Sequence, residues 1–112
     1  MKKVLIVLTL FLVLCGCSEN TSKFNIEKIM SENEYIIVDV RTMEEYEESH
    51  VVGSRNIPYD KIDGEVDLDR NSVIFVYCKS GARSEIAYNN LKKLGYTVYN
   101  LGAFSTIDLP KE

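Results

Sequence analysis

Blocks of apolar and polar residues alternate along the chain and predict alternating strands and helices. Two continuous apolar runs rich in β-branched residues, Tyr35–Val40 and Val73–Tyr77, have the length of strands that are buried on both faces. Thr97–Leu101 predicts the last strand, and residues 51–58 predict a turn followed by a short strand that ends at Pro58.

Helical spacing occurs between these runs. Apolar residues at positions i, i+3 and i+4 predict a short helix over residues 25–31. Thr42 and Glu45 stand three residues apart in the order of a capping box, which predicts a second helix that ends near Ser49. Residues 60–71 are polar and predict a loop with one helical turn.

The third predicted helix covers residues 82–94 and is followed by Gly95, a residue type favoured just after a helix end. Its predicted apolar stripe consists of Ile86, Ala87, Asn90, Leu91 and Leu94. Beyond the last strand, residues 102–109 predict a loop or a short helix.

Short connections between alternating strands and helices are typical of the α/β class, in which helices cover both faces of a parallel sheet. In such sheets the ligand site lies beyond the carboxyl ends of the strands. The two long apolar strands deliver Cys78, Asp39 and Arg41 to that edge. We therefore expect these three polar side chains to lie on one rim of the sheet.

Cys78 is the main candidate for chemistry. It ends an apolar strand, and a polar loop containing Gly81 leads from it into a helix. A thiol at that position meets unpaired backbone N–H groups and the positive end of the helix dipole, which favour the thiolate. The alternative is a buried structural cysteine that behaves as a small hydrophobe. The polar residues directly after Cys78 argue against that alternative.

Residues 1–16 have the pattern of an export signal. Lys2 and Lys3 precede the apolar run Val4–Leu14, which is too short to span a bilayer comfortably. A small residue, Gly16, directly precedes Cys17, an order that resembles the bacterial lipobox.

The lipobox resemblance implies cleavage after Gly16 and acylation of Cys17 with chains such as palmitate. Cys15 does not fit, because Leu14 would then occupy the small-residue site. The implied location is the extracytoplasmic side of a bacterial cell membrane. The alternative is an ordinary signal peptide with incidental cysteines.

The mature chain would then be one acidic domain, 24–112, behind a polar tether, 17–23. Loss of Lys2 and Lys3 lowers the Lys and Arg count from 13 to 11, against 17 Asp and Glu. This balance does not favour nucleic-acid binding, and an anionic substrate needs local positive charge. Cys78 becomes the single free thiol, so the mature chain forms no internal disulfide, and we expect a monomer.

Three segments resemble signatures of the rhodanese (sulfurtransferase) domain, in the order found in that family. The first comprises Asp39-Val40-Arg41, Glu45-Tyr46, His50-Val51, Gly53 and Asn56-Ile57-Pro58; the second is Cys78-Lys79-Ser80-Gly81-Ala82-Arg83-Ser84; the third comprises Leu94-Gly95-Tyr96, Val98, Leu101 and Gly102. The resemblance covers almost the whole mature chain. It implies a sheet of about five parallel strands flanked by helices on both faces.

The resemblance also implies that a cysteine persulfide moves sulfane sulfur from thiosulfate or a similar anionic donor to a thiol or cyanide acceptor. Cys78 is the implied catalytic residue, and the implied substrate-binding loop is Lys79, Ser80, Gly81, Ala82 and Arg83. Backbone N–H groups of this loop would bind the anionic sulfur, with Gly81 at positive φ. Asp39 and Arg41, which the strands deliver to the same rim, are candidates for a supporting role. No metal or organic cofactor is required.

The chain departs from the family pattern at two places. Ser49 stands where glycine is frequent before the histidine, and residues 102–107 replace a Gly-Gly pair and a later tryptophan. We expect the second departure to change the pocket wall or its hydrophobic packing.

Two other functions are considered. Tyrosine phosphatases use Cys-x5-Arg, whereas here Arg83 gives Cys-x4-Arg and Ser84 occupies the arginine position. The shorter loop makes a narrower cradle, better suited to sulfur than to the tetrahedral phosphate or arsenate of phosphatases and arsenate reductases. The other possibility is a non-catalytic rhodanese-like lipoprotein that binds a partner or a small anion.

The remaining polar residues favour structural interpretations. His50, the single histidine, is more typical of a helix-end cap than of a general base. Arg41 could tune the site, but an Arg41–Glu45 pair is equally natural. The acidic stretch 44–48 is more typical of a solvated helix face than of a metal site. The seven tyrosines are scattered and do not form a stacking platform for nucleic acid.

Overall fold

A computed structural model of the protein describes residues 24–112. The predicted signal peptide, Cys17 and the tether to residue 23 lie outside this range. The described residues belong to two compact units, one that ends at Glu32 and one that spans Asn33–Glu112. Within residues 24–112, no helix combines the length and apolar composition needed to cross a membrane.

The first unit contributes helix α1, Ile26–Glu32. The Asn25 side chain accepts a hydrogen bond from the Lys28 N–H at 3.0 Å, as an N-cap residue does. This helix confirms the prediction over residues 25–31.

The second unit is built on a parallel sheet with the strand order β3-β2-β4-β5. Its strands are β2 (Tyr35–Asp39), β3 (Arg55–Asn56), β4 (Val73–Cys78) and β5 (Thr97–Ala103). These are the four segments that the residue pattern predicts. The strand count of about five came from the family resemblance and is one too high for residues 24–112, because no other segment there pairs with the sheet.

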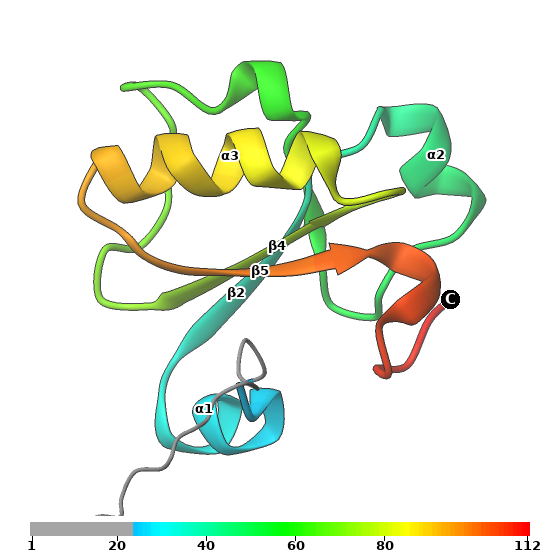
Figure 1. Ribbon diagram of the computed structural model, residues 1–112, viewed down its shortest axis with the longest axis horizontal. Helices are drawn as coiled ribbons and strands as arrows, with labels where there is room; N and C mark the ends of the chain where they lie inside the picture. Colours follow the sequence, from blue (N-terminus) through cyan, green and yellow to red (C-terminus); the bar gives the residue numbers. More distant parts are fainter. Residues whose placement is uncertain (1–23) are drawn as a thin grey trace, which may run out of the picture. The chain divides into compact units, whose positions relative to one another are not determined.

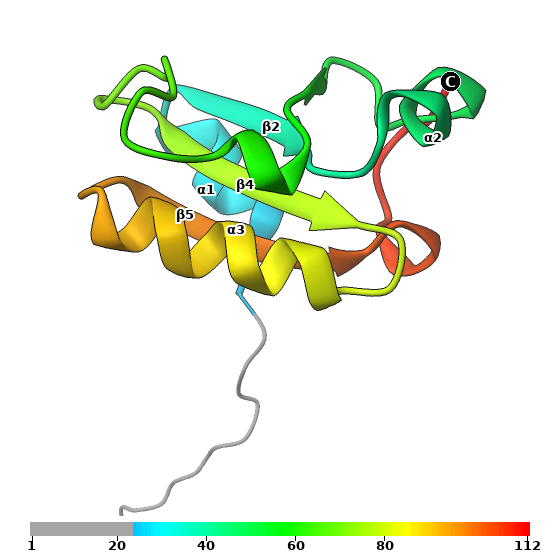
Figure 2. The ribbon, with the colours of Figure 1, turned by 90° about the horizontal axis from the view of Figure 1, so that it is seen from above.

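Helix α3, Ala82–Lys93, packs along one face of β4 and β5 (Figures 1 and 2). The core on this face includes Val38, Val40, Ile74, Val76, Cys78, Ala87, Leu91 and Val98. On the opposite face the Phe75 ring lies 6.1 Å from the Tyr35 ring and 5.7 Å from the Tyr99 ring. Both faces of β4 are therefore buried, as its apolar run predicts.

The end of α3 follows the prediction, but one residue of its stripe does not. The N–H of Tyr96 bonds the carbonyl of Leu91 at 3.1 Å, and Gly95, with φ +95°, bonds Lys92 at 3.0 Å. These two bonds form a Schellman motif. Ile86 is 47% exposed, so its assignment to the buried stripe is wrong. The inward face follows Ser84, Ala87 and Leu91, and Ile86 lies beside that line.

The other helical elements lie nearer the carboxyl ends of the strands. Helix α2 spans Met43–Glu48, and short 3-10 turns span Tyr59–Lys61 (η3) and Phe104–Thr106 (η4). Thr42 and Glu45 form the predicted capping box. Helix α2, the loop after β4 and η4 gather at one end of the sheet (Figures 1 and 2). This end holds Cys78.

Strand β5 contains a bulge just before η4. Val76 pairs with Asn100 and Tyr77 pairs with Gly102, so Leu101 has no partner in β4. Gly102 has φ +85°, a conformation that glycine adopts at no steric cost. The bulge places Ala103 beside Cys78, and η4 begins at the next residue, Phe104.

Candidate active site

The Cys78 sulfur is held by backbone amides of the loop that follows it. Sγ accepts hydrogen bonds from the Gly81 N–H at 2.9 Å and from the Ser84 N–H at 3.3 Å. Gly81 is the N-cap residue of α3 with φ +103°, and it has no side chain to cap the helix. The sulfur takes the place of a capping oxygen and lies at the positive end of the helix dipole.

This setting lowers the pKa of Cys78. Burial alone raises it, but hydrogen bonds from the Ser84 side chain and from the N–H groups of Ser84, Gly81 and Ser80 outweigh burial. The Ser84 hydroxyl lies 3.5 Å from Sγ and 3.0 Å from the Gly81 carbonyl. It can turn from that carbonyl towards the sulfur when the thiol loses its proton.

Ser84 is a site residue that sequence reasoning did not include. It is fully buried and supplies both a backbone and a side-chain contact to the sulfur. The sequence signal was its position: Ser84 is the third residue of the helix that follows Gly81. The backbone N–H at that position has no partner within the helix and is free to bind the sulfur.

Cys78 is buried, although the polar residues after it argued against a buried cysteine. The residue is 0% exposed and belongs to the apolar core, because α3 and the cysteine loop cover the strand end. The polar residues after it, Lys79 and Ser80, are exposed, as the sequence suggests. The structure thus combines the burial of a structural cysteine with the hydrogen bonding of a thiolate.

Arg83 and Glu45 form a two-pronged ion pair that links the start of α3 to α2. Arg83 Nη1 and Nη2 lie 2.8 and 3.1 Å from the two carboxylate oxygens. The hydrogen bond from Arg83 is the main reason that the pKa of Glu45 falls to about 2. The alternative Arg41–Glu45 pair does not form, because Glu45 pairs with Arg83. Arg83 is already engaged, so its direct contact with substrate stays a prediction.

Arg41 pairs with Asp39 instead. Its Nε lies 2.9 and 3.0 Å from the two Asp39 oxygens, and its Nη2 lies 2.6 Å from one of them. Nη2 also donates to the Ser49 carbonyl at 2.6 Å. Burial lowers the pKa of Arg41. The hydrogen bonds to Asp39 and the negative charge of Asp39 raise it by more, so the net shift of the pKa is upward. Both residues lie on the predicted rim, and both are buried.

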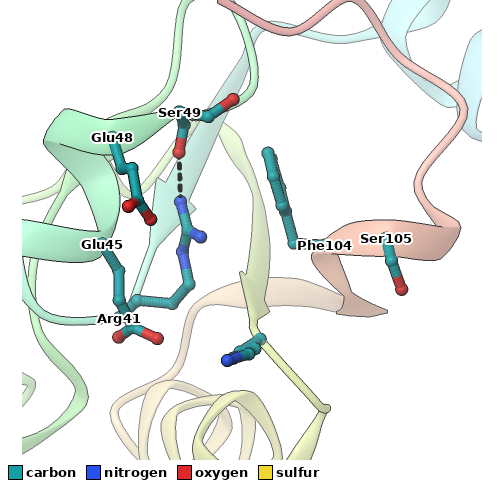
Figure 3. A pocket seen from close by; sticks show the side chains of 7 residues that line it. Arg41, Glu45, Glu48, Ser49, Phe104 and Ser105 are labelled. Atoms are coloured by element: carbon teal, nitrogen blue, oxygen red, sulfur yellow. Dashed lines mark hydrogen bonds between the residues drawn. The ribbon is translucent and has the colours of Figure 1, made fainter.

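A hollow of about 320 Å³ opens beside the cysteine loop (Figure 3). It is lined by Arg41, Glu45, Glu48, Ser49, Lys79, Phe104 and Ser105. The Phe104 ring lies 4.4 Å from the centre of the Arg41 guanidinium group. Phe104 and Ser105, in the segment that departs from the family pattern, thus form part of the wall of the hollow, and the effect of that departure stays a prediction.

The predicted loop residues divide between the sulfur and this hollow. Ser80 and Gly81 direct their N–H groups at Sγ, whereas the Lys79 side chain lines the hollow. Ala82 begins α3 and is exposed, with no hydrogen bond to the sulfur. The predicted residues of the loop lie close together, but Ser80 and Gly81 contact the sulfur whereas Lys79 lines the hollow.

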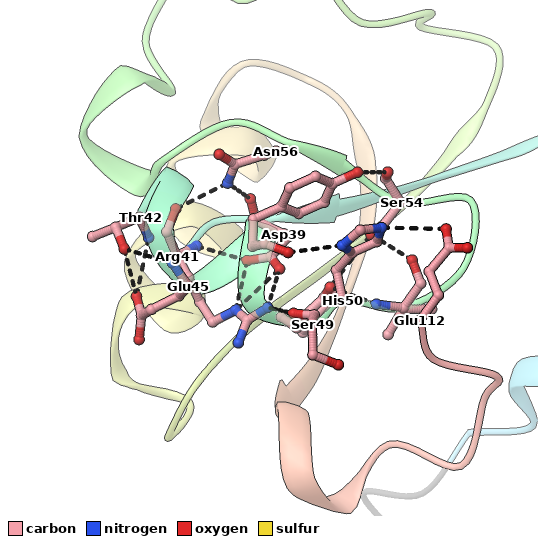
Figure 4. A network of polar contacts seen from close by, with 12 residues as sticks. Asp39, Arg41, Thr42, Glu45, Ser49, His50, Ser54, Asn56 and Glu112 are labelled. Atoms are coloured by element: carbon pink, nitrogen blue, oxygen red, sulfur yellow. Dashed lines mark hydrogen bonds and ion pairs between the residues drawn. The ribbon is translucent and has the colours of Figure 1, made fainter.

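His50 has the structural environment that the sequence analysis favoured (Figure 4). Its Nδ1 lies 2.7 Å from the Tyr46 carbonyl, so this nitrogen carries a proton and donates. Its Nε2 lies 3.3 Å from a Glu112 carboxylate oxygen, and its ring stacks on Tyr46 at 3.9 Å. These contacts tie the end of α2 to residues 110–112.

The acidic stretch 44–48 is only partly a solvated face. Glu44 and Glu47 are exposed and line no pocket, but Glu45 binds Arg83, and Glu48 lines the hollow. Among the described residues, no three His, Cys, Asp or Glu side chains gather as a metal-binding group.

The sequence of the domain was compared with family models. The model for the rhodanese-like domain matches residues 25–105. The chain belongs to the rhodanese-like domain family. Its four-stranded parallel sheet with Cys78 at the carboxyl end of a central strand is the α/β architecture that the resemblance implied.

Two curated relatives of this rhodanese-like chain are similar in sequence. The "Thiosulfate sulfurtransferase PspE" of Escherichia coli (strain K12) is 37% identical over 78 residues, which cover 66% of this chain and 75% of the relative. The "Putative sulfur carrier protein YrkF" of Bacillus subtilis (strain 168) is 38% identical over 71 residues, 62% of this chain. The matched part spans only 38% of the Bacillus protein.

Solved structures resemble this rhodanese-like fold as well. The structure described as "rhodanese with anions from E. coli" has a TM-score of 0.64 and 36% identity. The match covers 70% of this chain and 96% of that one. The BH2092 protein from Bacillus halodurans has a TM-score of 0.59 and 30% identity, over 70% of this chain and 61% of that one.

Proposed function

We propose that the protein is a sulfurtransferase that carries sulfane sulfur as a persulfide on Cys78. The observation that supports this function is the pair of N–H groups, from Gly81 and Ser84, that point at Sγ. They stabilise a negative charge on sulfur before and after the sulfur is loaded. The name of the E. coli relative makes thiosulfate the first donor to test.

In the loading step, the Cys78 thiolate attacks the outer sulfur of thiosulfate. A new S–S bond forms at Sγ, and the S–S bond of thiosulfate breaks with its electron pair on the departing sulfite. The persulfide keeps one negative charge. No metal or organic cofactor takes part in this balance.

In the unloading step, a nucleophile removes the outer sulfur. A thiolate or cyanide attacks it, and the electron pair of the breaking bond returns to Cys78 as a thiolate. Because Cys78 is 0% exposed, the residues that cover the sulfur must shift before either reagent can reach it.

The burial of Cys78 also favours a second candidate, a rhodanese-like domain that binds a partner or a small anion without catalysis. In that case the sulfur would only cap the N–H groups at the start of α3 and would never react with a donor. Sulfur loading separates the two functions.

The test is the intact mass of the protein after incubation with thiosulfate. We expect a gain of one sulfur atom in the wild type, lost again on addition of cyanide with release of thiocyanate. Cys78→Ser should show neither change, and circular dichroism should confirm that it is folded. A wild type that stays at its original mass with every sulfane donor tried would favour the binding domain.

We also propose that the domain is held at the extracytoplasmic face of a bacterial membrane through acylated Cys17, as the lipobox pattern implies. In cells that express the full chain, labelled palmitate should enter the wild type and Cys15→Ser, but not Cys17→Ser. The Cys17→Ser protein should leave the membrane fraction. Equal labelling of all three proteins would contradict the anchor.

A further inference from the structure

The hollow beside the cysteine loop is a charged recess next to the proposed nucleophile. Its volume, about 320 Å³, is at the lower end of the ~300–1,000 Å³ typical of small-molecule sites. Lys79, which follows Cys78, lines it. A reagent that reaches the sulfur when the loop shifts would be held here.

One side of this hollow offers an anion a hydrogen-bond donor from Arg41, whose charge is balanced by Asp39, and the positive charge of Lys79, which is unpaired within residues 24–112. Asp39 and Ser49 engage Nε and Nη2 of Arg41 but leave Nη1 without a hydrogen bond in the described part of the chain. Arg41 is only 5% exposed, so its orientation is fixed. The Lys79 ammonium forms no ion pair with any described residue. Together these groups suit a carboxylate.

The hollow also carries negative charge. The Glu48 carboxylate lies on the α2 side, near Arg41 (Figure 3), and makes no ion pair among residues 24–112. Glu45 also lines the hollow, but its charge is balanced by Arg83. Glu48 therefore disfavours a plain anion such as thiosulfate at this place and suits an ammonium group.

We propose that the hollow binds the sulfur acceptor and selects a small zwitterionic aminothiol, of which cysteine is the simplest example. The carboxylate would meet Arg41 and Lys79, the ammonium group would meet Glu48, and the short methylene stem would lie on Phe104. This inference rests on the proposed function, because it names the acceptor of that reaction.

The transfer balances without another reagent. The bound thiol first loses its proton to water, and the thiolate attacks the outer sulfur of the Cys78 persulfide. The new S–S bond gives the persulfide of the aminothiol. The electron pair of the old bond stays on Cys78 as a thiolate.

The first experiment measures single turnovers. Protein is loaded with thiosulfate, freed of excess donor and mixed with cysteine, cysteamine or 3-mercaptopropionate. Loss of the extra sulfur is followed by mass. With rates corrected for the thiolate fraction of each acceptor, cysteine should be about three- to tenfold faster than either analogue, since each lacks one of two exposed charge contacts. Equal or faster transfer to 3-mercaptopropionate would overturn the proposal.

Charge variants sharpen this result. Glu48→Gln should lower the cysteamine-to-mercaptopropionate rate ratio about two- to fivefold, and Lys79→Gln should raise it by a similar factor. Glu47→Gln is the matched control, because Glu47 is an exposed neighbour on α2 that does not line the hollow. If Glu48→Gln changes the ratio no more than Glu47→Gln does, the acceptor assignment is wrong.

A binding measurement separates this inference from the proposed function. S-methylcysteine cannot accept sulfur, but it keeps both charged groups and the stem. Its binding to unloaded protein, followed by NMR titration, should weaken in Glu48→Gln and stay unchanged in Glu47→Gln. Failure of every sulfane donor to load Cys78, with such binding intact, would refute the transferase function and leave the hollow as a binding site without a role in transfer. Normal loading without this binding would refute the acceptor site alone.

Discussion

Two arginine–carboxylate pairs flank the cysteine loop, and they differ in their access to water. Asp39 and Arg41 are buried, with side chains 0% and 6% exposed, whereas Glu45 and Arg83 are 26% and 27% exposed. The buried pair fixes a wall of the hollow, and the half-exposed pair ties α2 to the start of α3. We therefore expect the loss of the buried pair to destabilise the fold strongly and the loss of the half-exposed pair to destabilise it modestly.

The largest effect is expected from breaking the buried pair. Asp39→Asn keeps the side-chain shape but leaves Arg41 as a buried charge without its partner, which typically costs about 3–5 kcal/mol of unfolding free energy. Urea denaturation of the domain measures this loss. The control is Asp60→Asn, at an exposed position in η3, with an expected change within about 0.5 kcal/mol. A loss below about 1 kcal/mol for Asp39→Asn would remove the distinction between the pairs.

The half-exposed pair should matter less for stability. Glu45→Gln removes its charge and part of the capping box, and we expect a loss of about 1 kcal/mol in the same denaturation experiment. Sulfur loading should slow a few-fold, because the start of α3 is held less firmly. Glu44→Gln, its exposed neighbour, should change neither quantity. If Glu45→Gln lowers the unfolding free energy as much as Asp39→Asn does, the exposure of an ion pair does not predict its contribution to stability in this protein.

Acid should weaken the half-exposed pair. The bonds from Arg83 lower the pKa of Glu45 from 4.5 to about 2 in the folded protein. The unfolded chain therefore binds a proton first, and the stabilisation from this group, complete above pH 4.5, is lost as the pH falls towards 2. Unfolding free energy measured between pH 5 and pH 2 should fall more steeply for the wild type than for Glu45→Gln. Parallel curves would contradict this assignment.

The smallest predicted effect lies between the two pairs, at the sulfur itself. Ser84→Ala removes the hydroxyl that helps to lower the pKa of Cys78, so the pH at which iodoacetamide modification reaches half its maximum rate should rise. Sulfur loading at neutral pH should fall a few-fold. Ser80→Ala keeps its backbone N–H and should leave the pH profile of alkylation unchanged. If the pH profile of Ser84→Ala matches that of the wild type, the hydroxyl does not contribute, and only backbone N–H groups stabilise the thiolate.

Features governed by neighbouring residues were predictable from sequence. The capping box at Thr42 and Glu45, the positive φ of Gly81 and the helix end at Gly95 depend on three or four consecutive positions. Residue type alone identifies these conformations. The placement of Cys78 at the end of a buried strand follows from the length of one apolar run.

Features that join distant segments were not predictable in this way. Glu45 could have paired with Arg41, four positions away, but it pairs with Arg83, which is 38 positions away, and Asp39 takes Arg41. Charge and spacing do not choose between such partners; the fold does, because it brings Glu45 on α2 close to Arg83 at the start of α3. The full burial of Cys78 has the same origin, because α3 returns over the strand end.

The bulge in β5 has a consequence for Phe104. Leu101 adds one residue without a partner in β4, so its deletion would keep the pairs Val76–Asn100 and Tyr77–Gly102. The extra local twist that a bulge introduces would be lost, and the aromatic wall two residues after Gly102 would turn. A change of chain length by one residue could thus reshape the recess beside the cysteine while the remaining strand partners stay the same.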